Sequence, residues 1–86
     1  MSAVSARLRK AILAAYSPGD AQRVIDAIEK DPDEERVQCA AVKAGSGSLE
    51  RFLYYWDMAK TDFRDTLVAA GFDSDPKEHL RWLDHV

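Results

Sequence analysis

A helical stripe of apolar residues in positions 49–70 constrains this chain more than any other feature of its sequence. Projected at about 100° per residue, these residues recur with the period of an α-helix over roughly six turns. The members of the stripe are Leu49, Phe52, Leu53, Trp56, Phe63, Leu67 and Ala70. We therefore expect one long, aromatic-rich helix whose stripe forms a wall of the core.

One charged residue interrupts this stripe. Lys60 projects close to its middle, and Asp57 and Arg64 flank it along one edge. Either the helix breaks near Thr61, or the lysine stem covers apolar neighbours while its ammonium group stays at the surface. We favour one continuous helix in which Lys60 lies between Asp57 and Arg64. A conflict between local pattern and fold is also a place to look for function.

Four shorter amphipathic segments surround this stretch, at about residues 3–15, 18–30, 33–44 and 76–85. Each repeats apolar residues at intervals of three and four, as a helix with one buried face does. The expected buried faces are Val4, Leu8, Ala11, Ile12 and Ala15; Ala21, Val24, Ile25 and Ile28; Val37, Ala40, Ala41 and Ala44; and Leu80 and Leu83 with Trp82.

Capping residues mark the boundaries of these segments. Ser17-Pro18, Asp31-Pro32 and Asp75-Pro76 each place a capping residue before a proline suited to the first helical turn. Farther along, Gly45 is expected to end a helix in the left-handed conformation and Ser48 to cap the next one. Gly71 and Phe72 predict a Schellman-type end, in which Phe72 folds back on Leu67.

Composition agrees with a single helical domain spanning residues 1–86. The hydrophobic fraction of 47% and the charged fraction of 31% are ordinary for a globular chain. No segment alternates with period two for long enough to be a strand. The sequence therefore predicts an all-α fold, a compact bundle of four or five short helices around one long aromatic-rich central helix.

Charge and cysteine content narrow the functional classes. The formal net charge of −3 argues against a surface dominated by phosphate contacts, and therefore against nucleic acid as the first choice of partner. A single cysteine, Cys39, cannot close a disulfide within the chain, which favours a reducing, cytoplasmic setting. The apolar run 11–16 is too short for a signal peptide or a membrane span, so no membrane partner is expected.

No pattern in the sequence indicates catalysis, a metal site or a cofactor. Cys39 has no histidine near it in sequence that could activate it as a nucleophile. His79 and His85 are six residues apart, whereas a helical metal site needs a spacing of three or four. Asp73 and Asp75 lack the glycine and the ligand spacing of a calcium loop. We therefore expect a protein that is not an enzyme and binds neither metal nor cofactor.

The outer side of the long helix offers the best candidates for an interaction surface. Tyr54 and Tyr55 cannot both face the core if Leu53 and Trp56 do, so at least one tyrosine should be exposed, on the same side as Met58. Tyrosine is enriched at interface centres. We expect a small non-catalytic interaction module that binds a protein partner or a second copy of itself.

The charged rows beside the stripe are further candidates. Lys60 and Arg64 would form a small anion-recognising edge next to Trp56, and Asp62 and Asp65 occupy the opposite side. The simpler interpretation is that these residues form surface ion pairs.

A nucleic-acid-binding regulator is the alternative function. Residues 42–55 read as helix, glycine turn and helix, which is the order of a helix-turn-helix motif. The second helix would present Glu50, Arg51, Tyr54 and Tyr55 near its start, with only one positive charge among them. One positive charge among these four residues is too few for strong phosphate contacts or for base recognition.

Residues 36–70 resemble a group of small, uncharacterised bacterial helical proteins. The group shares an Arg-Val-Gln-aliphatic-Ala run, a Gly/Ser turn and an Ala-Lys-x-Asp-aromatic-Arg-Asp-x-Leu run. The matching residues here are Arg36-Val37-Gln38-Cys39-Ala40, Ser48-Leu49-Glu50 and Ala59-Lys60-Thr61-Asp62-Phe63-Arg64-Asp65-Thr66-Leu67. Cys39 departs from the aliphatic residue of the pattern. The resemblance implies a helical fold, a bacterial, cytoplasmic origin and a common role for Lys60, Asp62, Arg64 and Asp65, and it transfers no activity.

Overall fold

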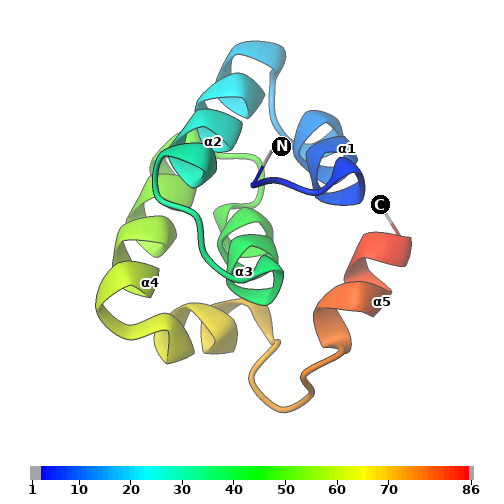
Figure 1. Cartoon of the computed structure of the whole chain (residues 1–86), viewed down its shortest axis with the longest axis vertical. Coiled ribbons are helices and arrows are strands. Elements are labelled where there is room, and N and C mark those ends of the chain that lie inside the picture. The colour runs from blue at the N-terminus through cyan, green and yellow to red at the C-terminus, as the bar shows by residue number, and fades with distance from the viewer. Residues whose placement is uncertain (1–2, 86) are drawn as a thin grey trace.

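The computed structural model describes residues 3–85, and within this range the chain is helical and contains no strand. The all-α bundle expected from the sequence is confirmed (Figure 1). Residues 3–85 form five helices, which are α1 (Ala6–Ala15), α2 (Pro18–Lys30), α3 (Glu35–Gly45), α4 (Leu49–Ala70) and α5 (Glu78–Asp84).

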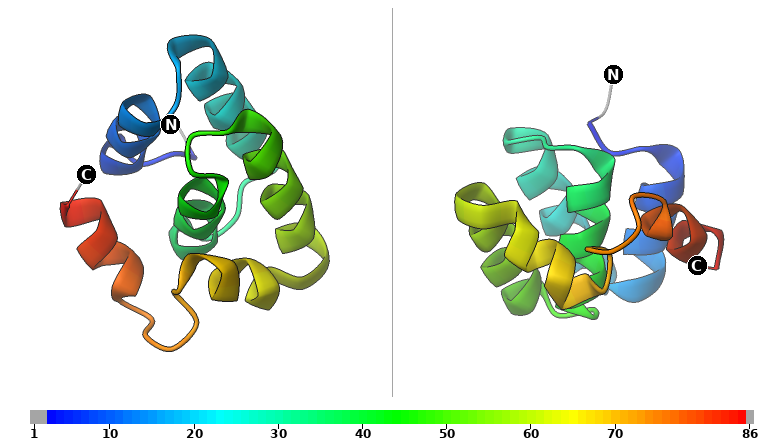
Figure 2. Two further views of the ribbon diagram at one scale, coloured as in Figure 1. Left: turned by 180° about the vertical axis from the view of Figure 1, so that it is seen from behind. Right: turned by 90° about the horizontal axis from the view of Figure 1, so that it is seen from below.

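Helix α3 lies in the middle of the molecule, with the other four helices arranged around it (Figures 1 and 2). Its burial extends well beyond the predicted stripe, of which Val37, Ala40 and Ala41 are buried and Ala44 is only half-buried. Its small side chains allow the long helix α4 to approach closely. The buried residues of α3 are Val37, Gln38, Cys39, Ala40, Ala41, Val42 and Gly45.

Helix α4 approaches α3 closely at Gly45. A Cβ atom placed on this glycine would clash with the hydroxyl of Tyr16 and lie only 3.0 Å from the Cα atom of Phe52. The expectation that Gly45 takes the left-handed conformation is wrong, because the helix continues through it. Ser46 (φ 50°) and Gly47 (φ 85°) make the left-handed turn instead. Gly45 is required for packing rather than for turning.

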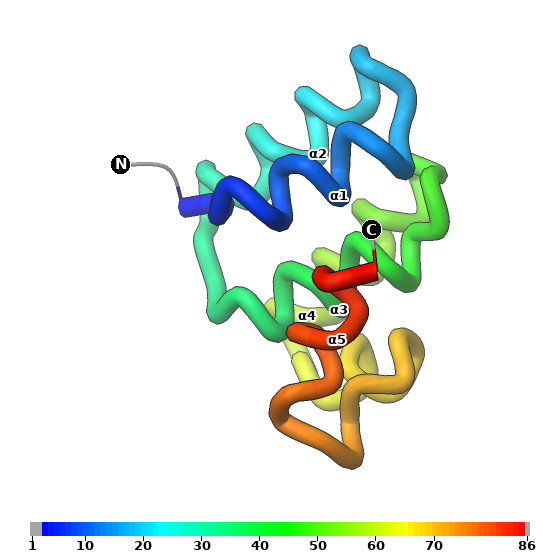
Figure 3. The backbone as a smooth tube through the Cα atoms, turned by 90° about the vertical axis from the view of Figure 1, so that its right-hand side faces the viewer, coloured from blue at the N-terminus to red at the C-terminus, as the bar shows by residue number. Residues whose placement is uncertain are grey.

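Helices α1 and α2 form a hairpin above α3 (Figure 3). The side chain of Ser5 caps α1 by accepting a hydrogen bond from the backbone N–H of Leu8. Pro18 occupies the first turn of α2 as expected, although the side chain of Ser17 makes no capping bond. The predicted buried face of α2 is confirmed in full, whereas Ala15 at the end of α1 is exposed rather than buried.

The connection between α2 and α3 differs from the predicted helix start at Asp31-Pro32. Asp31 ends α2 rather than capping α3, and Glu34 occupies the N-cap position of α3. The carboxylate of Asp33 accepts the backbone N–H of Glu34 at 2.8 Å. The buried Gln38 holds this connection by donating from Nε2 to the carbonyl of Asp33 at 2.6 Å. These two hydrogen bonds attach the loop to the start of α3.

The stripe of α4 is partly confirmed. Phe52, Trp56, Leu67 and Ala70 are buried, but Leu53 is 45% and Phe63 is 47% exposed. The expected continuous helix is also wrong, because Asp62 has a non-helical backbone (φ −149°, ψ 95°) that kinks α4. The kink resets the helical phase, which turns Phe63 out of the stripe. The residues before and after Asp62 therefore behave as two segments.

The end of α4 follows the sequence prediction closely. Gly71 is left-handed (φ 77°), its N–H donates to the carbonyl of Val68, and the N–H of Phe72 donates to the carbonyl of Leu67. This is the hydrogen-bond pattern of a Schellman motif, and the Phe72 side chain is fully buried. Helix α5 begins at Glu78, two residues later than the predicted start at Pro76.

Candidate functional site

The first half of α4 carries an exposed apolar surface on its outer side. Phe52 and Trp56 face inward and stack at 5.8 Å between ring centres, which fixes the rotation of this segment. Since successive residues lie about 100° apart, Leu53 and Tyr54 point outward. Their exposed fractions are 45% and 62%. We call Leu53, Tyr54, Tyr55 and Met58 the tyrosine face.

The two tyrosines differ in burial. Tyr54 is exposed, whereas Tyr55 is half-buried and packs against the core. Met58, one turn after Tyr54, is also half-buried. Their rings meet edge to face at 5.2 Å, a favourable arrangement for aromatic pairs. The prediction that at least one of them is exposed is confirmed. That this face binds a partner remains a prediction.

A shallow hollow of about 440 Å³ adjoins the tyrosine face at the start of α4. Its walls are Ser48, Glu50, Arg51, Tyr54 and Tyr55. Ser48 caps this end of the helix as predicted, accepting the backbone N–H of Arg51 at 3.3 Å. The hollow combines two aromatic rings with one basic and one acidic side chain, so it offers apolar area and hydrogen bonds without a net charge.

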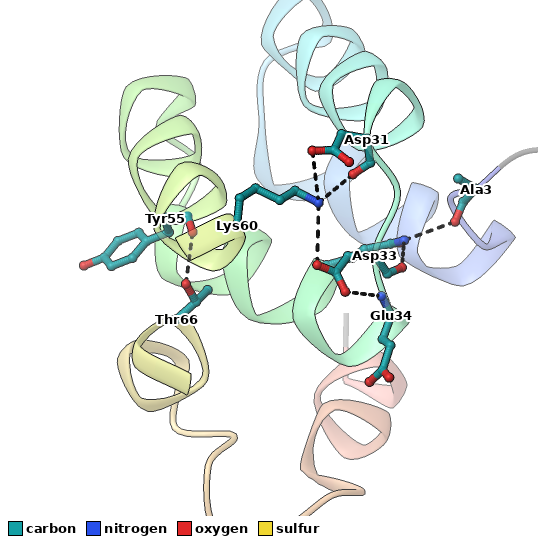
Figure 4. A network of polar contacts seen from close by, with 8 residues as sticks. Ala3, Asp31, Asp33, Glu34, Tyr55, Lys60 and Thr66 are labelled. Carbon is teal, nitrogen blue, oxygen red and sulfur yellow. Dashed lines mark hydrogen bonds and ion pairs between the residues drawn. The ribbon is translucent and has the colours of Figure 1, made fainter. Parts of the chain in front are cut away.

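Lys60 points away from this surface, toward the connection between α2 and α3 (Figure 4). Its Nζ atom donates to the carbonyl of Asp31 at 2.7 Å and lies 3.5 Å from a carboxylate oxygen of Asp31 and one of Asp33. It also lies 4.2 Å from the centre of the Trp56 ring. The expected position between Asp57 and Arg64 is therefore wrong. Asp31 and Asp33 therefore compensate the positive charge of Lys60, which the sequence suggested as part of an anion-recognising edge.

Asp62, Arg64 and Asp65 lie at the kink of α4. The carboxylate of Asp62 accepts the backbone N–H of Arg64 at 3.1 Å, so Asp62 caps the second segment of the helix. Asp65 is exposed in the first turn of that segment, where a negative charge is favoured. The Thr66 hydroxyl joins the two segments by donating to the carbonyl of Tyr55 at 3.0 Å (Figure 4). The guanidinium of Arg64 lines a second hollow.

The candidate residues thus separate into three places rather than forming one site. Tyr54, Tyr55 and Met58 share the tyrosine face. Lys60 contacts the α2–α3 connection, and Asp62, Arg64 and Asp65 lie at the kink of α4. Sequence reasoning did not identify Asp31 and Asp33 as the partners of Lys60, because both lie almost thirty positions away along the chain. It also missed Arg36, which lines the second hollow together with Arg64.

Two buried groups with acidic protons are held in their neutral forms. Burial raises the pKa of the Cys39 thiol to about 12, and the charge of Glu35 adds to this effect. Burial also raises the pKa of Tyr16 to about 12. A thiol with such a pKa is protonated at neutral pH and is therefore a poor nucleophile.

Within residues 3–85, no group of three His, Cys, Asp or Glu side chains is arranged to hold a metal ion. In the same range, no helix is both long and apolar enough to cross a membrane.

Comparison with known proteins identifies no relative. No family model matches the chain, and neither a curated protein nor a solved structure matches it. The resemblance of residues 36–70 to small bacterial helical proteins therefore stays a prediction.

Proposed function

We propose that this chain is a small non-catalytic protein-interaction module that binds through the tyrosine face, either to a protein partner or to a second copy of itself. The observation that carries this proposal is the adjacent exposure of Leu53 and Tyr54 on a helix whose opposite side is buried in the core through Phe52 and Trp56. An exposed apolar surface on a rigid element is typical of interaction sites.

The chemistry of the face fits a protein partner. Tyrosine combines a large apolar body with a hydroxyl that forms hydrogen bonds, and aromatic residues and methionine are enriched at interface centres. Tyr55 packs against the core and meets Tyr54 edge to face, which limits the freedom of the exposed ring. A side chain that is already restrained loses less entropy on binding.

Two exposed leucines provide a matched test. Leu53 lies on the tyrosine face, and Leu13 on α1 is 56% exposed outside it. A photoactivatable phenylalanine analogue at position 54 should crosslink a defined partner, or a second copy, in the native cell. Leu53→Ser should abolish the crosslinked product, while Leu13→Ser should preserve it.

Sedimentation velocity over a wide range of concentrations separates self-association from binding of another protein. A concentration-dependent dimer that Leu53→Ser dissociates identifies the partner as a second copy. A monomer at all concentrations, together with no crosslinked product that depends on Leu53, would contradict the proposal.

A nucleic-acid-binding regulator is the second candidate. The observation in its favour is the connection of α3 to α4 by a three-residue turn at 46–48, as in helix-turn-helix proteins. Against it, Glu50 offsets Arg51 at the start of α4. A mobility-shift assay at low salt should show binding that Arg51→Glu weakens, and no shift at low salt would exclude this function.

A further inference from the structure

A second hollow, of about 390 Å³, lies beyond the kink of α4 and opens to solvent. It is separate from the tyrosine face and shares no lining residue with the hollow there. Its walls come from the start of α3, the second segment of α4 and the loop that follows. The lining residues are Arg36, Phe63, Arg64, Leu67, Val68 and Asp73.

One wall of this hollow is apolar. Phe63 is 47% and Val68 is 59% exposed, although both are large hydrophobic side chains on a helix. Their exposure follows from the kink at Asp62, because the second segment turns Leu67 and Ala70 toward the core and leaves Phe63 outside. A cluster of exposed apolar side chains around a concave surface is typical of a binding groove.

Two of the three charged residues that line the hollow are arginines. Arg36 is fixed by a 2.6 Å hydrogen bond from Nη2 to the carbonyl of Phe72, and its Nε atom is buried without a hydrogen-bond partner among residues 3–85. The guanidinium of Arg64 makes no ion pair in the same range. By contrast, Arg7, Arg9 and Arg81 all contact carboxylates within the chain.

We infer that this hollow binds a peptide segment of another protein that carries one carboxylate beside aliphatic or aromatic side chains. Arg36 and Arg64 face the carboxylate, and Phe63 with Val68 contacts the apolar neighbours. Two guanidinium groups match a carboxylate through charge and paired hydrogen bonds. The inference does not depend on the function proposed for the tyrosine face.

Asp73 narrows the class of occupant. Its carboxylate lies on the wall of the same hollow, so the site has two positive charges and one negative charge. A polyanion such as a nucleic-acid backbone would meet both Asp73 and the apolar wall, which disfavours it. A single carboxylate on a mainly apolar peptide fits both parts of the surface, and Asp73 can accept a backbone N–H from that peptide.

Amide chemical shifts of the ¹⁵N-labelled protein provide the test. The probes are short, end-blocked peptides in which one glutamate is flanked by pairs chosen from Leu, Phe, Ile and Met. Each is compared with the same peptide carrying glutamine. We expect saturable shifts at Arg36, at 63–68 and at Asp73 with a glutamate peptide. Its glutamine counterpart should bind about tenfold more weakly, the size of a hydrogen bond to a charged group.

Arg64→Glu and Arg51→Glu form a matched pair of variants. Both residues are exposed, and both donate their backbone N–H to the capping side chain of their own helical segment. The two variants change the net charge equally. Arg64→Glu should reduce the affinity for the glutamate peptide by about tenfold or more, and Arg51→Glu should leave it unchanged.

Three results would overturn the inference. The first is the absence of saturable shifts at these positions with every glutamate peptide. The second is equal binding of the glutamate and glutamine peptides, or equal effects of the two variants. The third is a concentration dependence of the same amide shifts without peptide, which would identify a second copy of this chain as the occupant.

Discussion

The ammonium group of Lys60 lies 4.2 Å from the centre of the Trp56 ring, one turn away on the same helix. The same group donates to the carbonyl of Asp31, at the end of α2. Lys60 therefore joins the first segment of α4 to the α2–α3 connection through a hydrogen bond and two ion pairs, while the contact with Trp56 lies within α4. The Lys60 side chain is 26% exposed and that of Asp31 is 67% exposed, so solvent screens the ion pair with Asp31 more than the contact with the buried Trp56.

Replacing Lys60 tests how much these contacts contribute to stability. We expect Lys60→Met to lower the free energy of unfolding by about 1–2 kcal/mol, since the variant loses a partly buried cation–π contact and a charged hydrogen bond. Urea denaturation measures the effect. Lys10→Met, at an exposed helical position on α1, is the control and should change stability by less than about 0.5 kcal/mol. Equal effects of the two variants would show that the contacts of Lys60 contribute nothing to the free energy of unfolding.

The kink at Asp62 leads to a second prediction. Asp62→Ala removes the cap of the second segment of α4 and should cost about 1 kcal/mol of stability. Asp62→Asn keeps a side-chain oxygen that accepts the Arg64 N–H, so its cost should be much smaller. Hydrogen exchange of the Arg64 amide should accelerate in the alanine variant alone. Unchanged exchange in that variant would contradict the capping role.

The sequence predicts those features that depend on neighbouring residues. The apolar face of α2, the Ser48 cap and the Schellman end at Gly71 and Phe72 are all confirmed, because each is set by contacts within a few positions. The kink also had a local signal. Asp62 stands three residues before Asp65, an arrangement related to a capping box, and a helical segment that starts here places Phe63 outside the stripe.

Features that join distant parts of the chain could not be predicted. Nothing near Lys60 in sequence indicates Asp31 as its partner, and nothing near Gly45 indicates the approach of Tyr16 and Phe52. The hollow that combines Arg36 with Arg64 likewise depends on how α3 and α4 pack. The tyrosine face was predictable in part, since its exposure follows from the burial of Phe52 and Trp56 on the same helix.

The contact at Gly45 predicts opposite effects for two glycine substitutions. Gly45→Ala would push a methyl group against the backbone of Phe52 and the hydroxyl of Tyr16, which donates to the carbonyl of Val42 at 2.9 Å. We expect a loss of about 1–3 kcal/mol from overpacking. Gly19 in α2 has nothing within 4 Å of an added Cβ, so Gly19→Ala should gain about 0.4–1 kcal/mol. Thermal denaturation of both variants measures the contrast, and destabilisation by both would contradict it.

The buried thiol of Cys39 provides a probe of unfolding. Its side chain is fully buried and its pKa is raised to about 12 by burial, so both access and ionisation oppose its reaction. At pH 8 we expect a disulfide reagent to modify the native protein on the order of 10³-fold more slowly than the protein in urea, as a stability of several kcal/mol requires. Rapid labelling of the native protein would place the thiol at the surface instead.

Glu35 should make stability depend on pH in the acid range. Burial opposes ionisation of this carboxyl, but hydrogen bonds from Ser5 and Arg7 outweigh burial and hold its pKa below the ordinary value of 4.5. Because the folded pKa is depressed, the contribution of Glu35 is present above pH 4.5 and is lost as the pH falls through the lower folded pKa. Between about pH 5 and pH 3, the wild type should therefore lose more stability than Glu35→Gln. The difference should be less than about 1 kcal/mol, because the ion pair with Arg7 is partly exposed. Urea midpoints across this range measure the difference, and the exposed neighbour variant Glu34→Gln should follow the wild type. If Glu35→Gln lost as much stability as the wild type, the pairing of α1 with α3 through this carboxylate would contribute nothing.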